Sequence, residues 1–226
     1  MFDRFCRLIR VAVVLVLLMG ALSACAVGRS VVDIQAPVST ASAPPSGPAV
    51  KITDVRDLRQ FEVNPRDPSQ PSLGDADEIK NPAITSRAIG RKRNGYGMAI
   101  GDVALPEGTT VMVLVRGAVQ KALQDQGYRV VTEGSPDYPT AAPLTVSITQ
   151  FWAWFTPGFE VTAQSKSAII MSGDQLLTTS PAAAEGYARY GTVAVFESTW
   201  KDVVERGVAD LSTNVAAQIR PAPGAR

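Results

Sequence analysis

The sequence predicts an α+β fold, in which a mainly antiparallel sheet of about four to five strands carries two amphipathic helices on one face. Two segments, 109–126 and 200–219, have apolar residues at helical spacing, and several others alternate apolar and polar residues as strands do. The expected order is strand, long loop, helix, four strands and helix. Two helices on one face of a sheet suit that order.

The first expected strand lies at 49–55, at the start of a single α+β domain that spans residues 50–220. Residues 58–107 contain many Pro, Gly, Asp and Asn residues and little periodicity. We therefore expect a long irregular insertion there, partly helical within 81–93.

The first helix should begin after Thr109 or Thr110 as its N-cap and end at Gln126, with Gly127 in the left-handed conformation behind it. A short strand is expected at 128–131. The apolar stripe of the helix consists of Val111, Val115, Ala118, Val119, Ala122 and Leu123.

Three further strands are expected at 144–155, 159–171 and 175–190, the last interrupted around Ser180-Pro181. The first of them alternates up to Thr149 but is apolar on both faces at 151–155. The second helix should follow at 200–219, where Gly207 costs about 1 kcal/mol relative to Ala. Residues 221–226 read as a disordered tail.

The composition argues against an enzyme, because the chain has no histidine and two cysteines. Neither a Ser-His-Asp triad nor a histidine metal site can be built from it. We expect no metal and no cofactor. Residues 1–24 hold three arginines and one aspartate, which leaves 19 basic and 20 acidic residues. Such a neutral remainder argues against a nucleic-acid partner.

The N-terminus has the pattern of a signal peptide. Residues 1–10 are basic, and 11–22 form an apolar run of 12 residues. As a helix this run would be about 18 Å long, too short for the ~30 Å hydrocarbon core of a bilayer. A short apolar run behind a basic start is typical of an export signal that is removed.

The residues Leu22-Ser23-Ala24-Cys25 resemble the lipobox of bacterial lipoproteins. The resemblance implies that residues 1–24 are cleaved and that Cys25, as first mature residue, carries a diacylglycerol on its sulfur and an acyl chain on its amine. Ala26, where Asp would favour the inner membrane, favours the periplasmic face of the outer membrane. The alternative is an ordinary secretory signal followed by a chance cysteine.

Residues 25–49 would then form the lipidated cysteine and a flexible tether. They are rich in Ala, Ser, Pro and Gly, and a flexible chain of this length spans roughly 27 Å. A short strand around Val31, Val32 and Ile34 is the alternative.

The segments 122–130 (ALQDQGYRV) and 144–151 (LTVSITQF) resemble the YajG-like family of bacterial lipoproteins. The resemblance implies a periplasm-facing outer-membrane lipoprotein of largely uncharacterised function. Similar small lipoproteins serve as auxiliary components of envelope lipid or solute transport systems.

Two clusters are candidate binding sites. The first could bind anions such as phosphates, with a solvated loop and one buried structural arginine as the alternative: Arg87, Arg91, Lys92 and Arg93. The second could contact a partner or lipid, with core packing under the long loop as the alternative: Phe151, Trp152, Trp154, Phe155 and Phe159.

These observations lead to one main hypothesis, a non-catalytic lipid-anchored module that binds an envelope protein or polymer. A transport auxiliary is the second hypothesis. A carboxylate-dependent envelope hydrolase is a minor third, because the acidic residues near expected turns have no spacing that fixes their geometry. Those residues are Glu133, Asp137, Asp174 and Glu185.

Overall fold

The computed structural model describes residues 28–39, 46–158 and 160–224. The expected signal peptide, its expected cleavage box Leu22, Ser23 and Ala24, the expected lipidation site Cys25 and the aromatic residue Phe159 lie outside the described residues.

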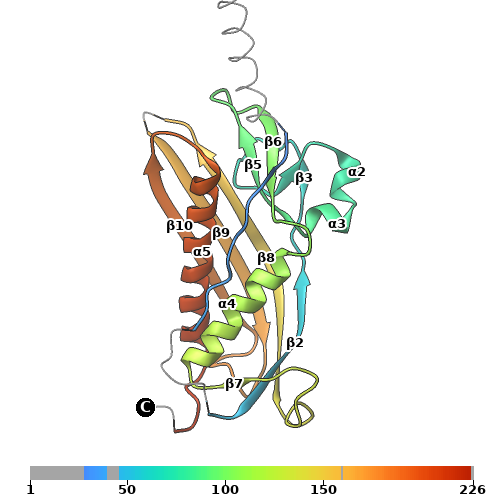
Figure 1. Ribbon diagram of the computed structural model, residues 1–226, viewed down its shortest axis with the longest axis vertical. Coiled ribbons are helices and arrows are strands. Elements are labelled where there is room, and N and C mark those ends of the chain that lie inside the picture. The colour runs from blue at the N-terminus through green and yellow to red at the C-terminus, as the bar shows by residue number, and fades with distance from the viewer. Residues whose placement is uncertain (1–27, 40–45, 159, 225–226) are drawn as a thin grey trace, which may run out of the picture.

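A mixed eight-stranded sheet forms the centre of the domain (Figure 1). Between its described strands, four pairings are parallel and three are antiparallel. Its strands are β1 (Ser30–Val31), β2 (Ala49–Asp57), β5 (Ala88–Arg93), β6 (Ala99–Ala104), β7 (Arg129–Val130), β8 (Ala142–Thr156), β9 (Val161–Ser172) and β10 (Ala182–Thr192).

The prediction of an α+β fold with a mainly antiparallel sheet of four to five strands is therefore wrong, and the fold is α/β. The reason lies in the connection between β2 and β8, which are neighbours and run parallel. Parallel neighbours need a long crossover, usually through a helix. Here the chain between them includes helix α4 (Val111–Asp125). Only the β8–β9–β10 meander follows the antiparallel pattern that was expected.

Helices α4 and α5 (Glu197–Gln218) lie on the same face of this sheet, as the sequence predicts (Figure 1). The Thr110 side chain caps α4 by accepting a hydrogen bond from the backbone N–H of Val113, and Gly127 follows with a φ of +88°. Helix α5 begins three residues before the expected start. Its buried side chains include Trp200, Val204 and Leu211.

Residues 58–107 are not the irregular insertion that was expected. They contain a two-stranded sheet of β3 (Glu62–Val63) and β4 (Ser72–Leu73), and the short helices α2 (Ala76–Ile79) and α3 (Pro82–Thr85). They then supply β5 and β6 to the main sheet. Asp75 and Asn81 cap the short helices with their side chains. These local caps stabilise elements too short to show periodicity.

The described part of the expected tether, residues 28–39, is packed along the domain. Strand β1 pairs with β6, and the side chains of Val32 and Ile34 are buried. Figure 1 shows this segment running between α4 and α5. It is held there because the Gln35 N–H donates to Glu205 and Lys201 donates to the Asp33 carbonyl. The segment is thus part of the fold rather than a flexible linker.

The expected disordered tail is also packed where it is described. Ala222 is buried in the main core, and its N–H donates to the carbonyl of Gln126 at the end of α4 (2.9 Å).

Candidate functional site

The four cations of the expected anion site do not converge on one point. Arg87 directly precedes β5 and the other three are its last residues, and each donates to another part of the chain. Arg87 donates to the Leu105 carbonyl, and Lys92 to the Ser30 hydroxyl (both 2.9 Å). These two residues tie β5 to the chain around it.

Arg91 and Arg93 contact the loop between β3 and β4 instead. Arg91 donates to the Asn64 side chain, and Arg93 donates to the carbonyls of Pro65 and Gly97 (each 2.9 Å). Burial lowers the pKa of the Arg91 guanidinium, and the nearby positive charge of Arg93 lowers it further. Arg91 is buried, whereas Arg93 is half-buried and reaches a surface cleft.

The aromatic cluster packs inside the domain, on both faces of β8. Phe151 lies in the main core, and Phe155 meets Trp200 edge-on with ring centroids 4.3 Å apart. Trp152 and Trp154 form a second core with Leu73 on the opposite face, beneath residues 61–84. The described members thus follow the alternative reading, core packing under the long loop.

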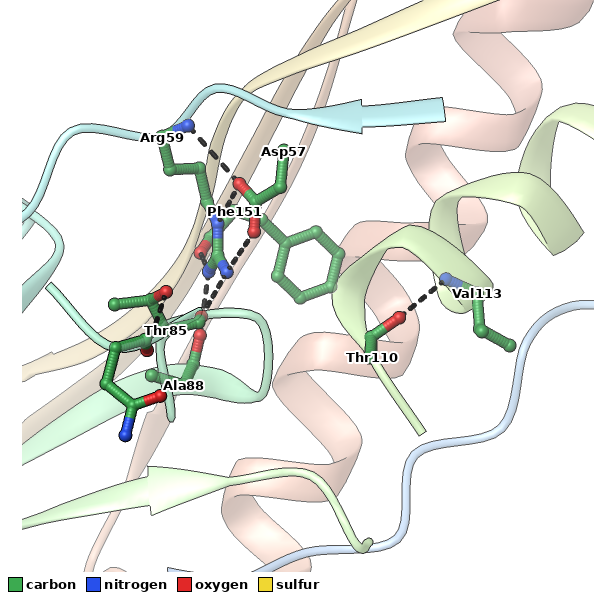
Figure 2. Close-up of polar contacts among 8 residues, drawn as sticks. Asp57, Arg59, Thr85, Ala88, Thr110, Val113 and Phe151 are labelled. Carbon is green, nitrogen blue, oxygen red and sulfur yellow. Dashed lines mark hydrogen bonds and ion pairs between the residues drawn. The ribbon is translucent and has the colours of Figure 1, made fainter. Parts of the chain in front are cut away.

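A buried arginine that sequence reasoning missed is Arg59, which follows β2 (Figure 2). Its guanidinium binds both carboxylate oxygens of Asp57 (2.8 and 2.7 Å). It also donates to three backbone carbonyls, at distances of 2.6 to 3.0 Å: those of Thr85, Ala88 and Phe151. An Asp-Leu-Arg triplet in a turn-rich stretch carries no sequence signal for this role. The site joins β2, β5 and β8 and is structural.

The acidic residues considered for catalysis do not pair with one another. Asp137 binds Arg129 (2.7 Å) and Glu185 binds Lys166 (3.2 Å). Among the residues that the structure describes, no three Asp, Glu or Cys side chains are placed to hold a metal ion.

A cleft of about 300 Å³ opens at one end of the sheet, and its lining combines charged and apolar residues. Arg66 and Arg93 contribute the cations, while Phe155, Val161 and Val195 contribute apolar surface. Asp67 adjoins Arg66. Hydrogen bonds from the Ser69 hydroxyl and N–H lower the pKa of Asp67, and the charge of Arg93 lowers it further.

Five large apolar side chains are exposed on the loops around this cleft. We call them the apolar end: Tyr96, Met98, Val193, Val195 and Phe196. Tyr96 and Val193 are 91% and 97% exposed. Gly95 and Gly97, which flank Tyr96, line the cleft together with Val195, so the two loops face each other across it. Contiguous exposed apolar surface is a common feature of interaction sites.

The described chain enters the domain at the same end. The Gly28 N–H donates to the Ile100 carbonyl of β6 (2.8 Å), two residues from Met98. Arg29 forms ion pairs with Asp102 (2.6 Å) and Glu78 (2.9 Å). A side chain at Gly101 would overlap the carbonyl of Gly28. The entry point is therefore fixed to β6.

Comparison with known proteins finds distant likenesses to solved structures. No family model and no curated protein matches the chain, so membership of the YajG-like family is not shown. A Xanthomonas campestris protein described as family DUF330 matches with a TM-score of 0.43 and 8% identity over 83% of this chain and 92% of that one.

A second crystal structure, of an uncharacterized protein, matches with a TM-score of 0.39 and 9% identity over 83% of this chain and 98% of its own. A minor lipoprotein from Acinetobacter baumannii matches with a TM-score of 0.31 and 12% identity over 48% of this chain and 87% of its own. The chain thus resembles a bacterial lipoprotein structure at a distance too great to carry functional argument. Across the described residues, the helices are too short or too polar to cross a bilayer.

Proposed function

We propose that this chain is a non-catalytic lipoprotein of the bacterial cell envelope, anchored through Cys25 to the periplasmic face of the outer membrane. It acts there as a binding or accessory module for an envelope protein or polymer. The observation that carries the proposal is the lipobox Leu22-Ser23-Ala24-Cys25 behind a short apolar signal. Two or three acyl chains on one cysteine give a stable anchor, whereas one gives a marginal one.

The position of the N-terminal segment supports this proposal. Residues 28–39 are built into the fold, so an anchor at Cys25 would act directly on the domain. The chain has no histidine, and its mature form would have no free thiol. The Ser–His and Cys–His pairs of nucleophile and base therefore cannot form, which supports the proposal that the protein is not catalytic.

Metabolic labelling with radioactive palmitate tests the anchor. Wild-type protein should take up label and sediment with the outer membrane, while Cys25→Ala should do neither. A matched control is Cys6→Ala, which removes the other cysteine and should leave labelling intact. Equal labelling of wild type and Cys25→Ala would contradict the proposal.

A second candidate function, an auxiliary role in lipid or solute transport, is favoured by the mixed cationic and apolar lining of the cleft. Phospholipid should then co-purify with the protein and be reduced by Val195→Arg, which places charge on the apolar wall. Unchanged lipid content in that variant would count against the role. Trp152 and Trp154 are unsuitable for this test, because they are core residues.

A further inference from the structure

We propose that the apolar end is a membrane-docking surface that lies against the anionic lipid surface of the bilayer carrying the anchor. The inference rests on the proposed lipidation of Cys25. It adds an orientation and a contact: the domain stands end-on, with the cleft facing the lipid headgroups.

The first argument is covalent reach. Gly28 is the third residue after Cys25. A fully extended chain spans at most about 11 Å over three such steps. Gly28 and Arg29 are held to β6 by the Ile100 carbonyl, Asp102 and Glu78. Acyl chains on Cys25 would therefore keep this end of the domain within about one helix diameter of the headgroups.

The second argument is the chemistry of the exposed side chains. The side chains of Tyr96, Met98 and Phe196 are 91%, 60% and 66% exposed. Aromatic side chains with a polar tip favour the boundary between headgroups and acyl chains. Contact with that boundary would remove the apolar surface from water.

The third argument is charge. Among the described residues, neither Arg66 nor Arg93 forms an ion pair with a carboxylate. The acidic residues of this end are Asp67, which is close enough for the charge of Arg93 to lower its pKa, Glu160 before β9, and Glu197 at the start of α5. The Nε of Arg93 is buried without a hydrogen-bond partner in the described part of the chain. Basic groups next to apolar anchors are attracted to anionic lipid.

These arguments favour a bilayer over a second copy of the chain as the occupant. The short chain between Cys25 and Gly28 holds the apolar end close to the membrane that carries the anchor. It does not bring a second copy of the chain to this surface. The loop after β7 and the described C-terminal residues lie at the opposite end, away from that surface (Figure 1).

Site-directed labelling tests the contact, because Cys25 is the only cysteine left once residues 1–24 are removed. Met98→Cys and Val193→Cys, each carrying an environment-sensitive fluorophore, are compared with Thr132→Cys, an exposed position in the loop after β7. The lipidated full-length mature proteins are placed in vesicles of phosphatidylethanolamine and phosphatidylglycerol. Some of the lipid molecules carry nitroxide quenchers near the headgroup.

Labels at 98 and 193 should lose most of their fluorescence to the nitroxide lipids, while the label at 132 keeps its own. Arg66→Glu should restore much of the signal at 98, whereas the charge reversal Arg220→Glu at the opposite end should not. Replacing phosphatidylglycerol with phosphatidylcholine should act as Arg66→Glu does.

Two results would overturn the docking proposal and leave the lipid anchor standing. In the first, the labels at 98 and 193 of a vesicle-bound protein are as unquenched as the label at 132. In the second, their emission shows that they have left water but the nitroxide lipids do not quench them, which indicates contact with protein. A chain without lipid on Cys25, seen as failure to join the vesicles, would overturn the proposed function together with this inference.

Discussion

Arg59 shows how one side chain connects three strands in this domain. Its guanidinium forms five hydrogen bonds, two to Asp57 and three to backbone carbonyls. Arginine has five N–H donors in a fixed planar arrangement, so the site uses its whole donor capacity. The side chain is fully buried, which makes any unpaired partner costly.

We therefore expect Arg59→Met to lower the free energy of unfolding by about 3–5 kcal/mol, because Asp57 and buried carbonyls lose their donor. The matched control is Arg56→Met. Arg56 pairs with Asp54 on the surface, and such pairs are worth at most about 1 kcal/mol. Urea denaturation followed by circular dichroism measures both. Similar losses in the two variants would show that the Arg59 site is not structural.

At the scale of elements, helix α5 packs closely against strand β10, at the left of the sheet in Figure 1. Small residues line the inward face of β10, and the Asn214 side chain of α5 donates to the Glu185 carbonyl on it. A methyl group at Gly186 would overlap the Gly207 carbonyl and lie 2.6 Å from the backbone nitrogen of Leu211. Gly207 is therefore part of the contact between α5 and β10. The low helix propensity of glycine, considered alone, gives no sign of this role.

Gly186→Ala should lower the free energy of unfolding by about 1–3 kcal/mol, because the helix backbone cannot rotate away from the new methyl group. Gly134→Ala places a methyl in open space and should change stability by no more than about 0.5 kcal/mol. Thermal melts of both variants compare the two sites. A Gly186→Ala protein as stable as wild type would contradict the packing described.

Strand β8 shows what sequence patterns reveal at this scale and what they miss. Its position was predicted, but its two-sided apolar run was not explained. The register shifts between Ile148 and Gln150, opposite β9. One extra residue moves every later side chain to the other face, so Ile148 and Phe151 share the main core while Trp152 points into the second. A bulge depends on pairing with another strand, so a single strand's sequence does not show it.

At the scale of the whole molecule, the N-terminal segment 28–39 lies between α4 and α5 in the layer of helices (Figure 1). The segment that was expected to be a tether crosses from β6 to the far end of α4, where the Ser39 hydroxyl donates to Asp125. The composition of the expected tether, rich in Ala and Ser, is that of a linker. In its described part, the side chains of Val32 and Ile34 are buried and Ala36 packs against the core. So few core contacts give only a short alternation of apolar and polar residues. The sequence therefore favours a linker over the alternative of a short strand.

Ile34→Ala should lower the free energy of unfolding by about 2–5 kcal/mol, as expected for a buried isoleucine. Val38→Ala in the same segment should have almost no effect, because Val38 is 77% exposed. Chemical denaturation of the two variants compares them directly. If both changes were silent, the segment would behave as a linker, and the short reach from Cys25 to the domain would be lost.

The chemical state of Cys25 decides whether the domain is a lipoprotein at all. Trypsin cuts after Arg29, so protein extracted from membranes yields a peptide of residues 25–29 if residues 1–24 have been removed. Mass spectrometry of that peptide should show Cys25 at its N-terminus, carrying a diacylglyceryl group and an acyl chain. A peptide with an unmodified Cys25, or one still joined to residues 11–24, would contradict the proposal.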